Sequence, residues 1–167
     1  MKTINILIGL KGSGKTYIGQ LLQSEYNIPF LRVEDICLKI KADRDVFDKE
    51  YISETFNLNE KEIRHQLQSV NELTIESTGA ASEFDLMLKN LEKDFIVRLI
   101  KINTNPLICL QRVKSRDLKA HIAVSDEKVI EINKLAAQKS YTYDLIISNE
   151  DKSDEDILNE LSQMFML

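Results

Sequence analysis

The chain has few of the residues that break, kink or cross-link a fold. Its 167 residues include 2 Pro, 5 Gly, 2 Cys and no Trp, which excludes a collagen-like, low-complexity or disulfide-framed protein. Cys37 and Cys109 lie far apart and form no metal-binding or redox motif, and the apolar neighbours of Cys109 favour a packed thiol. With 43% apolar and 29% charged residues, the composition is that of an ordinary globular domain.

Long hydrophobic runs and an excess of positive charge are also missing. No stretch approaches the length of a membrane span, and the first apolar run does not have the form of a signal peptide. We therefore expect no membrane partner and a cytoplasmic location. The net charge is −5 and no basic tract is present, so we expect no nucleic-acid partner. The length fits a single domain over residues 1–167, as a monomer or a homodimer.

The most informative motif occupies residues 9–16, Gly-Leu-Lys-Gly-Ser-Gly-Lys-Thr. It fits G-x-x-x-x-G-K-[ST], the P-loop that holds the phosphates of a nucleoside triphosphate. Its glycines let the backbone approach phosphate, and its N–H groups form an anion nest. An apolar run precedes the motif and a helical pattern follows it, which is the context this motif requires. The residues expected to bind the nucleotide are Gly9, Leu10, Lys11, Gly12, Ser13, Gly14, Lys15, Thr16 and Tyr17.

Strand and helix patterns alternate along the rest of the chain. Besides residues 4–8, strands are predicted over 28–32, 72–76, 95–102 and 143–147. Helices are predicted over about 34–42, 59–70 and 124–141, and from Ser82, Asn105 and Ser153 onward, with Asn59 as the cap of the second helix. Strands that alternate with helices predict an α/β fold, a parallel sheet with helices on both faces.

Residues 4–35 resemble the start of shikimate kinases, which are small-molecule kinases of the P-loop superfamily. The pattern Gly9-x-x-Gly12-x-Gly14-Lys15-Thr16-x-Ile18-Gly19-x-x-Leu22 follows the opening pattern of that family, and a looser likeness continues to the last strand. The resemblance implies a three-layer αβα fold with a five-stranded parallel sheet in the order 2-3-1-4-5. It also implies a substrate-binding helical insert at about residues 34–70 and a short, mobile lid at about 117–125.

The resemblance also assigns the side of the site that binds the phosphate acceptor. Glu34 matches the second Asp of the family's Asp-x-Asp motif, which binds a substrate hydroxyl and assists phosphoryl transfer; Arg32 replaces the first Asp. Arg64 matches the arginine that holds the substrate carboxylate. The family's three-glycine motif keeps only Gly79 here. The predicted substrate residues are Glu34, Arg64, Ser77, Thr78 and Gly79.

Four further residues complete the predicted site. Glu76 leaves the third strand beside the P-loop and can organise Mg²⁺ together with Thr16. Arg112 is predicted beside the nucleotide and Arg116 on the transferring phosphate, while Asn149 matches a position that borders adenine in related kinases. Each has a structural alternative, because cations favour helix C-termini and polar residues hydrogen-bond within turns. Glu34 has one too, since an acidic first turn complements the helix dipole.

The predicted chemistry is transfer of the γ-phosphate of ATP to a hydroxyl group of a small metabolite. Lys15, Glu34 and Arg116 are the predicted catalytic residues, and ATP and Mg²⁺ the predicted cofactors. A nucleoside or nucleotide kinase accounts for Arg112 and Arg116 equally well. An ATP-binding regulatory module without turnover is a third alternative, because a P-loop indicates nucleotide binding and not chemistry.

Overall fold

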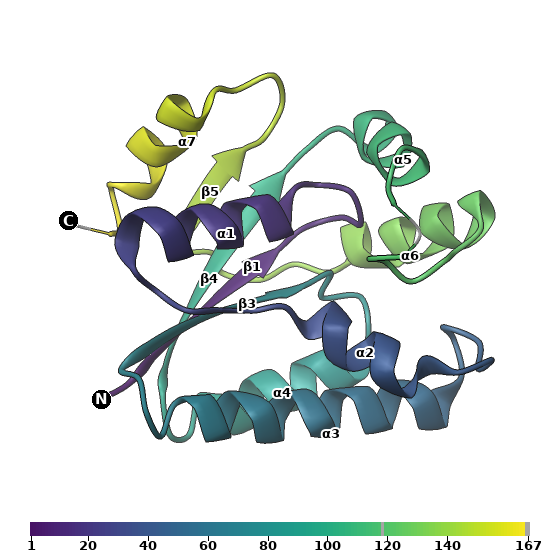
Figure 1. Cartoon of the computed structure of the whole chain (residues 1–167), viewed down its shortest axis with the longest axis horizontal. Helices are drawn as coiled ribbons and strands as arrows, with labels where there is room; N and C mark the ends of the chain where they lie inside the picture. Colours follow the sequence, from purple (N-terminus) through teal and green to yellow (C-terminus); the bar gives the residue numbers. More distant parts are fainter. Residues whose placement is uncertain (118, 166–167) are drawn as a thin grey trace.

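The computed structural model describes residues 1–117 and 119–165, which form five strands and seven helices around one sheet (Figure 1). All strand pairs are parallel, and the strand order is β2-β3-β1-β4-β5. This confirms the predicted fold class and strand order. The strands are β1 Thr3–Ile8, β2 Phe30–Leu31, β3 Glu72–Ser77, β4 Ile96–Asn103 and β5 Leu145–Ser148.

The helices occupy both faces of the sheet and its carboxyl edge. They are α1 Lys15–Tyr26, α2 Val33–Lys41, α3 Lys49–Gln66, α4 Ser82–Leu91, α5 Pro106–Lys114, α6 Asp126–Gln138 and α7 Asp154–Leu161. In Figure 1, α1 and α7 lie on one face of the sheet and α3 and α4 on the other. None of the helices in the described part of the chain is both long and apolar enough to cross a membrane.

The central strand β1 is buried on both faces, which explains its continuous apolar sequence. Ile4 and Ile6 pack into the cluster formed with α3 and α4, whereas Leu7 packs into the cluster on the side of α1 and α7. Burying each such side chain contributes roughly 1.5–3 kcal/mol. The carboxyl edge of the sheet, where the P-loop begins, is therefore held by two packed cores.

Gly19 sets the distance between α1 and β2. A Cβ atom at this position would lie 2.5 Å from the ring of Phe30, much closer than van der Waals contact permits. The close helix–sheet approach expected for Gly19 is therefore present.

The prediction for α3 was wrong at its start. The helix begins at Lys49, not at Asn59, and Asn59 is buried in mid-helix. The cap is Asp48, whose carboxylate accepts a hydrogen bond from the Tyr51 amide at 2.8 Å. The buried stripe of α3 includes polar residues at four-residue spacing, so the apolar pattern alone begins too late. That stripe consists of Tyr51, Thr55, Asn59 and Ile63.

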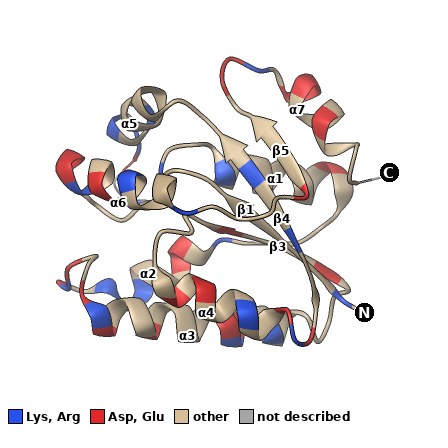
Figure 2. Cartoon of the chain, turned by 180° about the vertical axis from the view of Figure 1, so that it is seen from behind, with Lys and Arg blue, Asp and Glu red and all other residues tan. Residues whose placement is uncertain are grey.

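The starts of α5 and α7 follow the predicted capping chemistry. The Asn105 side chain accepts a hydrogen bond from the Leu107 amide at 2.9 Å. Ser153 and Asp156 form a reciprocal capping box. Acidic residues gather in the first turn of α7, where the helix dipole favours them (Figure 2). The helix predicted over 124–141 is α6, which is shorter and capped by Ser125.

Candidate functional site

The P-loop wraps its backbone around the Lys15 side chain. The Lys15 ammonium donates hydrogen bonds to the carbonyl oxygens of Gly9 and Leu10, both at 2.9 Å. Burial lowers the pKa of Lys15 to about 8, although the negative charge of Glu76 works in the opposite direction. Lys15 therefore presents a weakly hydrated cation at neutral pH, which suits the binding of a phosphate group.

Two glycines let the loop lie directly against its neighbours. Gly12 has φ 92°, and a Cβ atom there would lie 2.2 Å from the carbonyl oxygen of Cys109. Gly14 has φ 95°, and its Cβ would lie 2.0 Å from Nδ2 of Asn149. Both the backbone conformation and the space exclude a larger residue.

Asn149, Arg112 and Thr104 support the loop from the β4 and β5 side. The carbonyl oxygen of Ser13 accepts hydrogen bonds from Asn149 Nδ2 at 2.8 Å and from Thr104 Oγ1 at 3.0 Å. Arg112 donates to the Asn149 carbonyl at 3.0 Å. Arg112 and Asn149 thus contact the backbone of the nucleotide loop. Sequence reasoning missed Thr104; its place just after β4, at the edge where the P-loop begins, was the available signal.

Asn133 of α6 holds the tip of the same loop and was also missed. Its Oδ1 accepts a hydrogen bond from the Lys11 amide at 2.7 Å, and its Nδ2 donates to the Lys11 carbonyl at 3.2 Å. The residue is 7% exposed. An Asn on the apolar side of a helix was the signal in the sequence, because a buried amide needs partners.

Thr16 and Glu76 form a pair of oxygen groups beside Lys15. The Thr16 hydroxyl donates to Glu76 Oε2 at 2.8 Å, and Glu76 is 7% exposed at the end of β3. The described residues contain no cluster of three or more His, Cys, Asp or Glu that could hold a metal ion. Mg²⁺ commonly binds through a few protein oxygens together with substrate phosphates. The Thr16–Glu76 pair fits that donor set.

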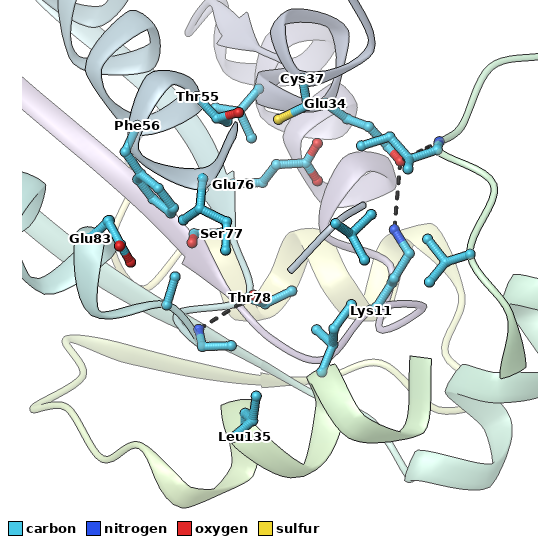
Figure 3. A pocket seen from close by; sticks show the side chains of 18 of the residues that line it. Lys11, Glu34, Cys37, Thr55, Phe56, Glu76, Ser77, Thr78, Glu83 and Leu135 are labelled. Carbon is cyan, nitrogen blue, oxygen red and sulfur yellow. Dashed lines mark hydrogen bonds and ion pairs between the residues drawn. The ribbon is translucent and has the colours of Figure 1, made fainter. Parts of the chain in front are cut away.

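A cavity of about 480 Å³ opens between the P-loop, α2, α3 and α6 (Figure 3). Most of the residues that the sequence proposed for catalysis, metal binding or substrate binding line it. The cavity brings together Lys11, Gly12, Lys15, Thr16, Glu34, Glu76, Ser77, Thr78 and Arg116.

Ser77, Thr78 and Gly79 form a tight turn after β3. Ser77 Oγ accepts from the Gly79 amide at 3.0 Å, and Thr78 Oγ1 accepts from the Ala80 amide at 3.4 Å. Gly79 has φ 70°, and its carbonyl accepts from the Tyr141 hydroxyl at 3.0 Å. Ser77 and Thr78 line the cavity while Gly79 shapes the turn behind them. The two hydroxyls therefore stabilise the turn itself.

Glu34 connects α2 to the segment predicted as a lid. Its carboxylate accepts hydrogen bonds from the Ile122 amide at 3.1 Å and contacts His121 Nδ1 at 3.0 Å. Lys11 Nζ lies 3.7 Å from it (Figure 3). Burial alone would raise the pKa of Glu34, but Lys11, His121 and the Ile122 amide outweigh burial and lower it to about 2. Glu34 is thus an anion and a very weak base. Leu118 of the predicted lid lies outside the described residues.

Arg64 and Tyr17 do not join the other predicted residues. Arg64 lies in the last turn of α3, where it pairs with Glu60 at 3.0 Å and Asp94 at 2.8 Å. The first two turns of α3 line the cavity instead. Arg64 therefore does not line the cavity, although the resemblance assigns it to the substrate site. Tyr17 is 39% exposed and donates its hydroxyl hydrogen bond to Asp154, toward α7.

Comparison with known proteins gives one family. A family model described as shikimate kinase matches residues 11–165. No curated protein sequence gives a significant match.

Among solved structures, the chain is similar to a shikimate kinase from Acinetobacter baumannii in complex with shikimate, at 18% identity and a TM-score of 0.64, over 98% of this chain and 92% of that one. It is similar to an APS kinase from Mycobacterium tuberculosis in complex with AMPPNP and APS, at 18% identity and TM-score 0.66, over 96% of both chains. A gluconokinase from Sinorhizobium meliloti aligns at 12% identity and TM-score 0.63, over 95% of this chain and 88% of that one. Identities this low indicate a shared fold alone.

Proposed function

Because the chain belongs to the shikimate kinase family, we propose that it transfers the γ-phosphate of ATP to a hydroxyl group of a small molecule. The observation that supports this most strongly is a single cavity lined by Lys15, Thr16, Glu76 and Arg116. These residues combine cations for phosphate with oxygen groups for Mg²⁺. The remaining walls of the cavity, from α2, α3 and α6, leave room for an acceptor.

In the proposed reaction, the acceptor oxygen attacks the γ-phosphorus as the bond from that phosphorus to the β–γ bridging oxygen breaks. ADP leaves with the electron pair of that bond, and the hydroxyl proton passes to water. Such transfers depend mainly on positioning and on stabilising the charge of the phosphoryl oxygens. Lys15 and the loop amides would hold the phosphates, and Arg116 would face the transferring group. Mg²⁺, held by Thr16 and Glu76, would neutralise phosphate charge.

Glu34 would position residues of the predicted lid and would not accept the proton of the acceptor hydroxyl. With a pKa lowered to about 2 by Lys11, His121 and the Ile122 amide against the opposing effect of burial, it is too weak a base for a hydroxyl. Its contacts with residues 121–122 would hold residues 119–125 of the predicted lid over the cavity. Residues 34–70, with α2 and α3, would form the acceptor side.

The test compares Lys15→Ala with Lys114→Ala in the presence of ATP, Mg²⁺ and a panel of hydroxyl compounds. Lys114 is a matched control, because its side chain is 55% exposed and pairs only with Asp126 among the described residues. We expect Lys15→Ala to lower transfer by about 10³-fold, the typical effect of removing one charge-stabilising donor, and Lys114→Ala to have no effect. ³¹P NMR of the product measures transfer, and circular dichroism checks folding. Full activity in a folded Lys15→Ala, or tight ATP binding by the wild type without transfer to any compound, would refute the proposal.

A further inference from the structure

The acceptor side of the cavity is lined mainly by apolar side chains. Its walls come from α2, α3, α6 and the segment before α6, and they include Val33, Ile52, Phe56, Ile122, Ile132 and Leu135. Phe56 and Leu135 project from opposite sides in Figure 3. Apolar walls stabilise a ligand by removing its hydrocarbon surface from water.

Cations are concentrated at the phosphate end of this cavity. Of the cationic residues that line it, Lys15 and Lys11 belong to the P-loop. Burial is the main cause of the lowered pKa of Lys15, and Arg116 is near enough to lower it further. The fourth, Lys49, is exposed in the first turn of α3. The acceptor walls instead include the carboxylate of Glu83, whose Oε2 accepts a hydrogen bond from Ser82 at 3.1 Å.

Arginines near the acceptor side are engaged elsewhere. Arg64 pairs with Glu60 and Asp94 at the far end of α3. Arg44 pairs with Glu54 at 2.7 Å and lies 5.1 Å from the centre of the Tyr51 ring; neither arginine lines the cavity.

Arg32 does not line the cavity either, and it pairs with Glu34 at 3.1 Å and with Asp35 at 2.9 Å. Lys11 already pairs with Glu34 at 3.7 Å. A carboxylate on the acceptor would therefore lose its hydration there without gaining a free buried cation, which is unfavourable.

Thr55 provides one polar group in these apolar walls. The residue is 7% exposed and lines the cavity. Its Oγ1 lies beside the Tyr51 hydroxyl but makes no hydrogen bond of good geometry with any of the described residues. Buried hydroxyls are nearly always paired, so an unpaired one at a cavity wall indicates a bond made to a ligand. Figure 3 places Thr55 beside Phe56 on the α3 wall.

From these observations we infer that the acceptor is an alcohol with a predominantly apolar and non-anionic body, hydrogen-bonded by Thr55. This inference rests on the proposed function and narrows its substrate class. The alcohol oxygen forms the new bond to the γ-phosphorus, the bond from phosphorus to ADP breaks, and the alcohol proton passes to water. The product is an alkyl phosphate ester.

The first test compares three compounds built on a six-membered carbon ring. Cyclohexylmethanol is apolar apart from its hydroxymethyl group, the methyl ester of shikimate is neutral but carries ring hydroxyls, and shikimate carries the ring hydroxyls and a carboxylate. Transfer is followed by ³¹P NMR, and binding by saturation-transfer NMR with AMPPNP present. We expect affinity to fall in that order, by at least about 10-fold from the first compound to the last. Equal or tighter binding of shikimate overturns the inference.

The second test removes the Thr55 hydroxyl. Because that hydroxyl makes no hydrogen bond of good geometry and only lies beside the Tyr51 hydroxyl, Thr55→Val should leave the melting temperature unchanged or raised. It should weaken binding of 4-(hydroxymethyl)cyclohexanol, which has a second hydroxyl, about 10-fold, and Thr55→Ser should restore it. A fall in melting temperature without a change in binding would assign Thr55 a structural role and overturn its part in recognition.

The third test adds a cation to the acceptor wall. Leu135 lines the cavity and is 41% exposed, so it can be replaced without loss of the core. Leu107 on α5 is the control, because it is 71% exposed and does not line the cavity. Leu135→Arg should shift the preference for cyclohexylmethanol over shikimate at least 5-fold toward shikimate, and Leu107→Arg should not. An unchanged preference in both variants counts against the inference.

The two proposals fail differently. Transfer to shikimate in preference to the neutral alcohol overturns the apolar acceptor and leaves the kinase intact. Failure to transfer phosphate to any compound, with the neutral alcohol still bound more tightly than shikimate, overturns the kinase and leaves the binding preference.

Discussion

The P-loop end of the cavity, which is the proposed nucleotide half, and the helical end, which is the proposed acceptor half, are built in different ways. The nucleotide half is mostly backbone, with Gly12 and Gly14 pressed against neighbouring atoms and Ser13 and Lys11 held by buried side chains. The acceptor half is made of side chains from helices that contribute less to the core; α2 has no fully buried residue. Phosphate geometry is the same in every nucleoside triphosphate, so one short motif can encode it. The acceptor surface has no such common geometry.

The largest effect is expected from Gly12→Ala in the nucleotide half. The new Cβ would lie 2.2 Å from the Cys109 carbonyl, at φ 92°, so both a clash and a left-handed backbone disfavour it. We expect ATP affinity to fall by at least about 100-fold, in line with a cost of roughly 3 kcal/mol. Isothermal titration with ATP measures this.

Gly79→Ala is the matched change in the acceptor half. Its Cβ would lie 3.2 Å from the Tyr141 ring, at φ 70°, a milder conflict. We expect a loss of about 1 kcal/mol in stability and unchanged ATP affinity. An equal loss of ATP affinity in both variants would contradict the separation of the two halves.

Asn133→Ala should be next in size. It removes both hydrogen bonds to the Lys11 backbone, a loss of about 2 kcal/mol and thus roughly 30-fold in ATP affinity if the loop must reorder on binding. Asn133→Asp keeps the oxygen that accepts from the Lys11 amide and loses the Nδ2 donor. Its ATP affinity in titrations should therefore lie between those of the wild type and Asn133→Ala. Wild-type affinity in Asn133→Ala would show that α6 does not organise the loop.

The pH dependence of ATP binding should follow Lys15. Burial lowers the pKa of Lys15 to about 8, so its charge is lost above that pH, and ATP affinity should fall about 5-fold between pH 8 and pH 9. Folding stability should change in the opposite sense, because the unfolded chain binds this proton more tightly and stability therefore rises with pH in the same window. A flat affinity profile from pH 7 to 9 would contradict this assignment.

An effect of similar size is expected from Glu34→Gln. Lys11, His121 and the Ile122 amide lower the pKa of Glu34 to about 2 against the effect of burial. The ionised form therefore stabilises the fold above the ordinary value of 4.5, and this stabilisation is lost as the pH falls from 4.5 toward 2. Glu34→Gln should cost about 1–2 kcal/mol at pH 7 and flatten the acid limb of a urea-unfolding profile. An unaltered acid limb would mean that these contacts do not form.

Much of the fold could be predicted from local signals. The P-loop spacing, the alternation of strands and helices, and the caps at Asn105 and Ser153 are contained in short windows of sequence. The start of α3 could not, because Thr55 and Asn59 on its buried face break the apolar pattern. Arg64 was assigned by its match to the family's substrate-binding arginine, and such a short match does not determine on which part of α3 the residue lies relative to the cavity.

By itself the sequence determined the phosphate-binding loop, the residues Lys15, Thr16 and Glu76 around it, and the parallel sheet that presents them. Those features depend on backbone geometry and on periodicities of a few residues. Only the tertiary structure decided that Arg112 and Asn149 brace the loop, that Asn133 holds its tip, and that the acceptor walls are apolar. Each of these depends on side chains that are far apart in the sequence and meet only when the helices pack at the carboxyl edge of the sheet.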